Sequence, residues 1–138
     1  MSLILPLEVP NLSWDQAEMI ASACSGPGKL RVRTGDRRRL LRPQPPSLWV
    51  DDADEMGRSL LAEDADWDEP SWKMDPDVLP LLAATIECLC AHLPQGFALS
   101  AIWFGDELRG RRDVSCEELL LIVRNSSMNP HTQYRVRC

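Results

Sequence analysis

The chain has 138 residues, of which 44% are hydrophobic and 26% are charged, so it can form one globular domain with its own core. Its net charge of −6 at pH 7 disfavours general binding to DNA or RNA, because the phosphate backbone attracts positive surfaces. Five cysteines, an odd number without framework spacing, favour a reduced chain in the cytoplasm. The apolar start is interrupted by Pro6 and Glu8, which predicts neither a signal peptide nor a membrane span.

The first predicted element is a helix that begins at Ser13 and ends near Ser25. Ser13 followed by Gln16 matches a capping box, in which each side chain bonds the other residue's backbone N–H. Residues 29–33 then alternate between cationic and apolar side chains, which is typical of a strand with one buried face. Residues 37–42 are expected to return as a second strand, giving a basic hairpin.

A long connection rich in proline, acidic residues and tryptophan follows over residues 43–76. Within it, residues 47–50 are expected to form a short strand. Residues 52–63 are predicted to form a helix, since acidic side chains in a first turn interact favourably with the helix dipole. Residues 64–76 are expected to form a loop.

The second half of the chain carries the stronger signals. Residues 77–92 have a broad apolar stripe at helical spacing, and the apolar run 97–104 is typical of a central strand against which this helix packs. Residues 111–114 are predicted as a strand, 115–125 as a capped helix and 132–137 as an alternating strand. This order predicts a single α+β domain spanning the whole chain, with helices packed on a mostly antiparallel sheet.

Charge is sorted along the sequence into two segments of opposite sign. The basic segment contains Lys29, Arg31, Arg33, Arg37, Arg38, Arg39 and Arg42. The acidic tract contains Asp51, Asp52, Asp54, Glu55, Glu63, Asp64, Asp66, Asp68 and Glu69. The acidic tract is interpreted either as a surface that steers a basic partner or as a solvated face. The basic segment is expected to pair with the acidic tract or to contact an acidic edge of a partner.

Three tryptophans lie in or beside the acidic tract. Tryptophan is enriched at interface hot spots, although these rings could equally attach the long connection to the core. The hypothesis is that acidic and aromatic residues together bind a partner protein with a basic cleft. The predicted partner-binding residues are Trp49, Asp51, Asp52, Asp54, Glu55, Asp64, Asp66, Trp67, Asp68, Glu69 and Trp72.

No catalytic residue, metal ligand or cofactor is predicted from the sequence. His92 and His131 lack neighbours at metal-ligand spacing, and Cys88 and Cys90 are too close together for a metal or redox pair. Two side chains separated by one residue diverge on a helix, so both cysteines are interpreted as small core residues. The chain is therefore expected not to be an enzyme.

The last third of the chain carries WFGDE at residues 103–107 and VSCEELLLIVRNSSMNPHTQYRVR at residues 114–137. This succession of strand, capped helix and Thr-x-Tyr-x-Val strand resembles small bacterial immunity-type proteins that are encoded beside polymorphic or contact-dependent toxins. The resemblance implies a non-enzymatic protein that binds one cognate toxin domain and occludes its active site.

Two alternatives to the immunity hypothesis remain open. The first is a small-ligand-binding or enzymatic domain with a pocket beside the strand at 97–104, which would use Ser100, Asp106 and Glu107. The second is a structural or adaptor subunit held to its partner by apolar surface.

Overall fold

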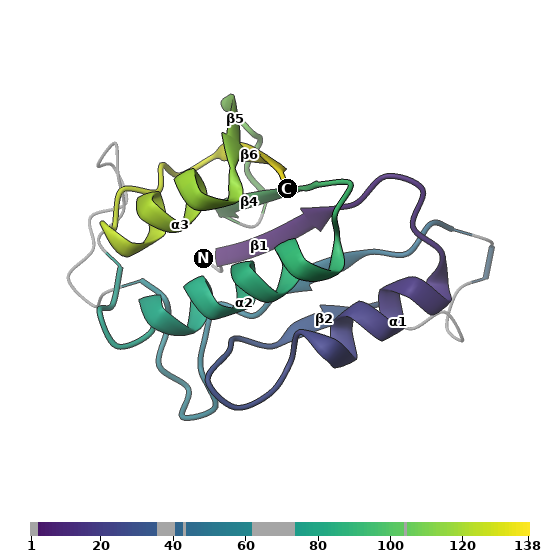
Figure 1. Cartoon of the computed structure of the whole chain (residues 1–138), viewed down its shortest axis with the longest axis horizontal. Helices are drawn as coiled ribbons and strands as arrows, with labels where there is room; N and C mark the ends of the chain where they lie inside the picture. The colour runs from purple at the N-terminus through teal and green to yellow at the C-terminus, as the bar shows by residue number, and fades with distance from the viewer. Residues whose placement is uncertain (1–2, 36–40, 43, 62–73, 104) are drawn as a thin grey trace.

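The computed structural model describes residues 3–35, 41–42, 44–61, 74–103 and 105–138, and all structural statements concern these residues. Their elements are β1 (Leu3–Glu8), α1 (Trp14–Ala23), β2 (Val32–Thr34), β3 (Leu48–Val50), α2 (Leu79–His92), β4 (Phe97–Trp103), β5 (Gly110–Ser115), α3 (Cys116–Arg124) and β6 (Thr132–Arg137). The strands form one sheet in the order β2-β3-β1-β4-β6-β5. Every pairing is antiparallel except the one between β5 and β6. The predicted α+β class is thus confirmed (Figure 1).

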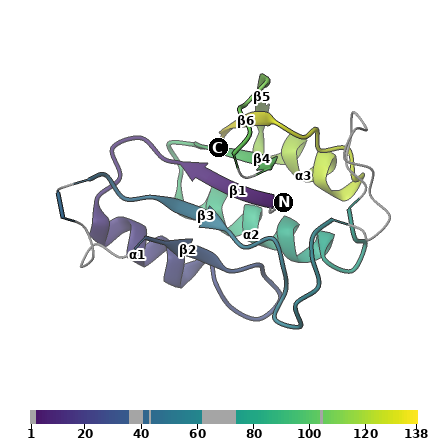
Figure 2. The same cartoon turned by 180° about the vertical axis from the view of Figure 1, so that it is seen from behind.

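The helices cover one face of the sheet, as comparison of Figure 1 with the reverse view in Figure 2 shows. Side chains that point to this face form the core, because residues two apart in a strand share a face. Ile86 and Leu89 of α2 are fully buried, and Trp103 of β4 is 5% exposed. All three belong to one hydrophobic cluster, which confirms that α2 is the central helix of the core. None of the described helices has the length and apolar character that a membrane crossing requires.

Strand β1 was not predicted, although it lies in the middle of the sheet between β3 and β4. Its alternation is regular: Leu3, Leu5 and Leu7 are buried and Glu8 is exposed. Pro6 obscured this pattern, because proline is rarely found inside a central strand. In the pairing of β1 with β4, Leu5 and Pro6 have no cross-strand partner, although the residues on either side of them do. Proline has no N–H to donate at that point of the ladder.

One prediction in the first half of the chain, the helix over 52–63, is wrong where the structure describes it. Strand β2 pairs with β3, where Val32 faces Val50, and the predicted return strand over 37–42 lies mostly outside the described residues. Residues 41 and 42 form a bend, and residues 36–40 lie outside the described part. The described residues 52–61 contain turns and single β-bridges in place of the predicted helix.

The absence of the predicted helix from the described residues 52–61 has a local cause. The Asp54 carboxylate accepts hydrogen bonds from the backbone N–H groups of Met56 and Arg58, at 3.1 and 2.8 Å. An aspartate that captures nearby N–H groups favours a turn over a helix. Gly57 has φ +80°, a left-handed conformation that also ends helical structure. The rest of the predicted helix, and most of the predicted loop at 64–76, lie outside the described residues.

The prediction of a fully reduced chain is also wrong. Cys90 of α2 and Cys116 at the start of α3 form a disulfide, with Cα atoms 6.6 Å apart. The bond joins two helices that pack on the same face of the sheet (Figure 1). Cys24, Cys88 and Cys138 are free thiols.

Candidate functional site

The predicted partner-binding segment meets the basic segment at one edge of the sheet. A pocket of ≈ 590 Å³ lies there, beside β2 and the turn that follows β3. It is lined by Ser25, Gly26, Lys29, Arg31, Arg33, Asp51, Ala53, Asp54 and Glu55. Cationic side chains thus come from the segment leading into β2, and carboxylates come from the segment leaving β3. We call this region the charged groove.

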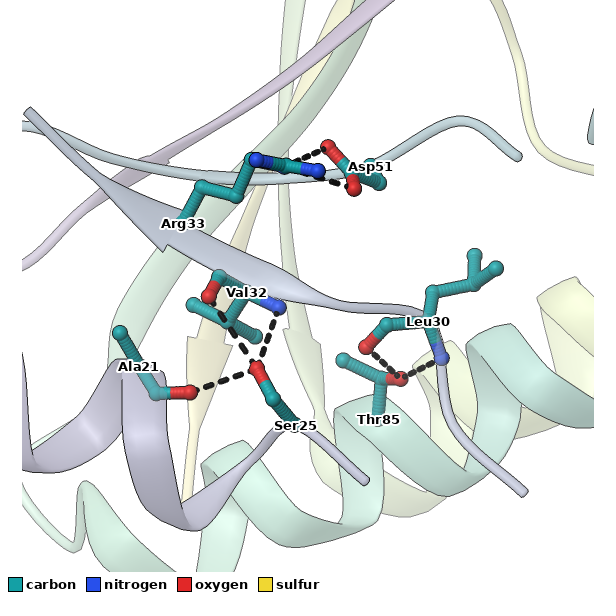
Figure 3. Close-up of polar contacts among 7 residues, drawn as sticks. All are labelled: Ala21, Ser25, Leu30, Val32, Arg33, Asp51 and Thr85. Atoms are coloured by element: carbon teal, nitrogen blue, oxygen red, sulfur yellow. Dashed lines mark hydrogen bonds and ion pairs between the residues drawn. The ribbon is translucent and has the colours of Figure 1, made fainter. Parts of the chain in front are cut away.

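The backbone at this edge of the sheet is held by a serine hydroxyl (Figure 3). The Ser25 hydroxyl accepts from the N–H of Val32 at 3.0 Å. Its single proton is shared between the carbonyl oxygens of Ala21, at 2.6 Å, and Val32, at 3.2 Å. An edge strand normally offers such groups to another chain, so their capture disfavours recognition by strand addition. At Val32, this edge of the sheet therefore presents side chains and not free backbone groups.

A second hydroxyl, from α2, holds the chain just before β2 (Figure 3). Thr85 is fully buried, and its hydroxyl accepts from the N–H of Leu30 at 2.8 Å. The same hydroxyl can donate its proton to either of two carbonyl oxygens, that of Leu81 at 2.9 Å and that of Leu30 at 3.1 Å. This contact fixes the floor of the charged groove to the central helix.

We expect Thr85→Val to lower the free energy of unfolding by about 1–3 kcal/mol, because it leaves the buried N–H of Leu30 without an acceptor. Urea denaturation with the disulfide intact measures this loss. Thr34→Val is the matched control, since the Thr34 hydroxyl bonds the adjacent Gly35 carbonyl alone among the described residues, and valine suits a strand. A loss at Thr85 no larger than the loss at Thr34 would contradict the assigned contact.

One ion pair crosses the charged groove. The Nε of Arg33 donates to both carboxylate oxygens of Asp51, each at 2.8 Å (Figure 3). The basic and acidic segments therefore pair internally at this point. Lys29, Arg31 and Glu55 make no ion pair with any residue that the structure describes, so charges of both signs remain at the groove.

The remaining carboxylates beside the groove differ in their protonation behaviour. For Asp52, desolvation by burial raises the pKa. A backbone hydrogen bond lowers it in part, and the negative charge of Asp51 raises it further. For Asp54, desolvation opposes ionisation, but the hydrogen bonds and positive charge of Arg58 outweigh it and lower the pKa. Asp54 is thus held internally by Arg58 through a contact of 2.8 Å, while Glu55 stays exposed.

Trp49 lies on the face of the sheet opposite to the core. Its neighbours Leu48 and Val50 are buried among the core residues, so the indole points to the other face. Across the strands it faces Pro6 of β1 and Arg33 of β2, and it is partly exposed. The structure therefore brings Trp49 and Asp51, both predicted site residues, together around Arg33.

The other predicted residues are distributed differently. Asp54 turns toward Arg58, and the lining of the charged groove carries both signs of charge. The remaining predicted site residues lie outside the described part of the chain: Asp64, Asp66, Trp67, Asp68, Glu69 and Trp72.

A second cavity, of ≈ 510 Å³, lies beside the start of β4. It is lined by Glu8, Val9, Pro10, Gln95, Gly96, Phe97, Ala98, Arg111, Gln133, Arg135 and Val136. Ser100, Asp106 and Glu107, which were expected to serve a pocket beside this strand, do not line it. Ser100 is 3% exposed, and Asp106 lies 3.5 Å from the Nε2 of His131.

A third site, absent from the sequence predictions, is formed by Cys24, Cys88 and His92. Cys88 and His92 lie one turn apart on the same side of α2, and Cys24 caps the end of α1. Their ligand atoms all lie within 4.8 Å of one another. Burial, and secondarily the Cys88 sulfur, raise the pKa of the Cys24 thiol to about 12, whereas Lys29 acts weakly in the opposite direction.

This cluster corrects the interpretation of two residues. His92 was described as having no cysteine at ligand spacing, yet a cysteine four residues earlier on a helix is such a neighbour. The spacing of Cys88 and His92 was therefore a signal that the sequence contained. As predicted, Cys88 and Cys90 diverge: Cys88 contacts His92 and Cys90 bonds Cys116.

Comparison of the chain with protein-family models, with curated proteins and with solved structures finds no match.

Proposed function

We propose that this protein is a non-enzymatic, immunity-type protein that binds a cognate toxin domain at the charged groove and occludes its active site. The observation that supports this most strongly is the group of charges at the groove that no residue described by the structure neutralises. Lys29, Arg31 and Glu55 line the groove together with the Arg33–Asp51 pair. Trp49 lies beside this pair.

This arrangement suits a protein partner better than a small molecule. Small-molecule pockets are lined mainly by apolar and aromatic side chains. The lining of the charged groove is dominated by ionic groups. A partner surface with a carboxylate opposite Arg31 and a cation opposite Glu55 would form ion pairs with both residues at once. Such complementary charges give specificity and fix the register of the two surfaces. The indole of Trp49 supplies the apolar area that a hot spot requires.

The floor of the groove is also preorganised for binding. Hydroxyls of Ser25 and Thr85 hold the backbone leading into β2, and Asp51 holds the Arg33 guanidinium. A rigid surface loses little conformational freedom on association, so more of the contact energy contributes to affinity. In the sequence, five further carboxylates follow Glu55 at Glu63, Asp64, Asp66, Asp68 and Glu69. These support the part of the proposal in which a basic cleft of the toxin is steered toward the protein.

The proposal includes a cytoplasmic location. Three free thiols, of which the exposed Cys138 is the most accessible, are consistent with a reducing compartment. The disulfide between Cys90 and Cys116 argues in the other direction. The redox state of these two cysteines in protein isolated from its own cells, measured by differential alkylation, tests the location directly.

The experiment is a binding and inhibition assay with a partner obtained by co-purification. We expect Arg31→Glu and Glu55→Lys each to weaken binding about tenfold or more, mainly through slower association with an altered salt dependence. Trp49→Ala is expected to accelerate dissociation, at a cost of about 2–4 kcal/mol. Arg112→Glu is the control, since Arg112 is an exposed arginine on β5 at the opposite edge of the sheet.

Two outcomes would contradict different parts of the proposal. If Arg31→Glu, Glu55→Lys and Trp49→Ala all bind the partner as the Arg112→Glu control does, the charged groove is not the docking site. If the complex forms but the partner keeps its full activity when the protein is in excess, the protein is not an inhibitor of that partner.

A further inference from the structure

The two free thiols and the imidazole near the junction of α1 and α2 have the composition of a soft metal site. Cys24 follows the last residue of α1, and its N–H donates to the carbonyl of Ile20 at 2.9 Å, which fixes the position of its Cα. Cys88 and His92 are presented by consecutive turns of α2. The sulfur of Cys88 also lies 3.5 Å from the carbonyl oxygen of Ala23, so the two helices are in contact at this point.

The two sulfur–nitrogen distances are close to those around a tetrahedral zinc ion. The Nδ1 of His92 lies 3.6 Å from the Cys88 sulfur and 4.0 Å from the Cys24 sulfur. With Zn–S and Zn–N bonds of about 2.3 and 2.0 Å, a tetrahedral angle separates sulfur from nitrogen by about 3.5 Å. The observed distances therefore need adjustments of about 0.1 Å at Cys88 and about 0.5 Å at Cys24. The flexible Cys88 and His92 side chains can provide them by small rotations.

We propose that Cys24, Cys88 and His92 bind one Zn²⁺ ion, with the fourth coordination position open toward solvent. Two thiolates and an imidazole favour zinc over hard ions such as Mg²⁺ or Ca²⁺, which take oxygen ligands. Cys24 is buried, Cys88 is half-buried and His92 is exposed, so the ion would be reached from the His92 side. Among the residues that the structure describes, no fourth histidine, cysteine or carboxylate joins this group.

Zinc binding changes the hydrogen bonds and protons of each ligand, and the protons and charges balance. Without metal, the Nδ1 of His92 lies 2.9 Å from the backbone carbonyl of Cys88, to which it donates when that nitrogen carries the proton. Zinc takes the Nδ1 lone pair, so the ring proton moves to the Nε2 of this exposed side chain. Both thiols lose their protons to solvent, and the two thiolates neutralise the charge of the ion. The Cys88 carbonyl keeps its helical hydrogen bond.

The test uses the full chain, stripped of metal by a chelator with the Cys90–Cys116 disulfide intact, and titrated with Zn²⁺ against a chromophoric chelator. We expect one equivalent of zinc per chain, and a loss of affinity of at least about tenfold in Cys88→Ser and in His92→Gln. Cys138→Ser is the matched control, because Cys138 is an exposed free thiol outside the cluster. Its affinity should equal that of the unmodified chain.

A second measurement uses the unmodified chain, so it does not depend on whether the variants fold. Zinc should protect Cys88 from alkylation in the unmodified chain, while Cys138 remains reactive. Co²⁺ in place of zinc should give a thiolate charge-transfer band that Cys88→Ser weakens. The proposal is overturned if no stoichiometric zinc binds, if Cys138→Ser loses as much affinity as Cys88→Ser, or if Cys24 and Cys88 form a disulfide in the isolated protein. The site lies on elements different from those that carry the charges of the groove, so its failure leaves the proposed function standing.

Discussion

Leu89→Ala should lower the free energy of unfolding by about 2–5 kcal/mol, which is the range for a leucine truncated in a rigid core. Leu89 is fully buried near the end of α2, in the same cluster as Ile86 and Trp103. Removal of its branched end leaves a cavity that the surrounding side chains cannot fill, because α2 is tied to β2 through Thr85 and to α3 through the Cys90–Cys116 disulfide. Urea denaturation followed by tryptophan fluorescence measures the loss.

The matched control for this variant is Leu121→Ala. Leu121 lies in α3 and is 59% exposed, so the same truncation removes little buried area there. We expect its free energy of unfolding to change by less than about 0.5 kcal/mol, since alanine is also a good helix former. Equal losses at the two positions would mean that α2 is not the central helix of the core.

Gly96→Ala should be comparably destabilising, by about 2–5 kcal/mol, for reasons of backbone geometry. Gly96 lies in the turn between α2 and β4 with φ +92°, a conformation that L-residues rarely adopt. A Cβ at this position would lie 2.5 Å from the carbonyl oxygen of Val136 in β6. Strained backbone costs about 1–3 kcal/mol, and a forced shift of packed backbone costs a similar amount. The shift would separate Phe97 from Val136, which are paired in the sheet.

Gly110→Ala is the control for the glycine substitution. A Cβ at Gly110 would meet the Thr132 hydroxyl at 3.7 Å, an ordinary van der Waals distance, and Gly110 is not among the residues with positive φ. Alanine there should leave stability within about 0.5 kcal/mol of the unmodified chain. A Gly96→Ala protein as stable as Gly110→Ala would show that the turn relaxes without moving β6. Thermal denaturation of both variants under the same conditions distinguishes these results.

The elements predicted correctly are those whose signals are local. Ser13 and Gln16 form the expected capping box of α1, because both partners lie within one helical turn. Ser115 caps α3, as predicted, by accepting from the N–H of Glu118. The alternation of β6 likewise placed Tyr134 and Val136 in the core, where they are 0% and 3% exposed. Such signals involve neighbours that the chain brings together in any compact fold.

Strand partners were predicted less well, because pairing is decided by contacts distant in sequence. The alternation near Val32 indicated a strand, but nothing within the segment specifies β3 as its partner. The hydroxyl of Thr85, 55 residues away from Leu30, is part of what fixes that choice. Strand β1 needs β3 and β4 on either side to compensate for a proline in its middle.

The sequence by itself therefore determined the α+β class, the central helix, the buried strand β4 and the separation of charge into two segments. Only the tertiary structure decided how these features combine. It paired Arg33 with Asp51, placed Trp49 on the face away from the core and joined Cys90 to Cys116. It also brought Cys24 beside Cys88 and His92. The physical reason is that helix periodicity and capping are short-range, whereas ion pairs, disulfides and ligand clusters form between side chains that only packing of the core brings within bonding distance.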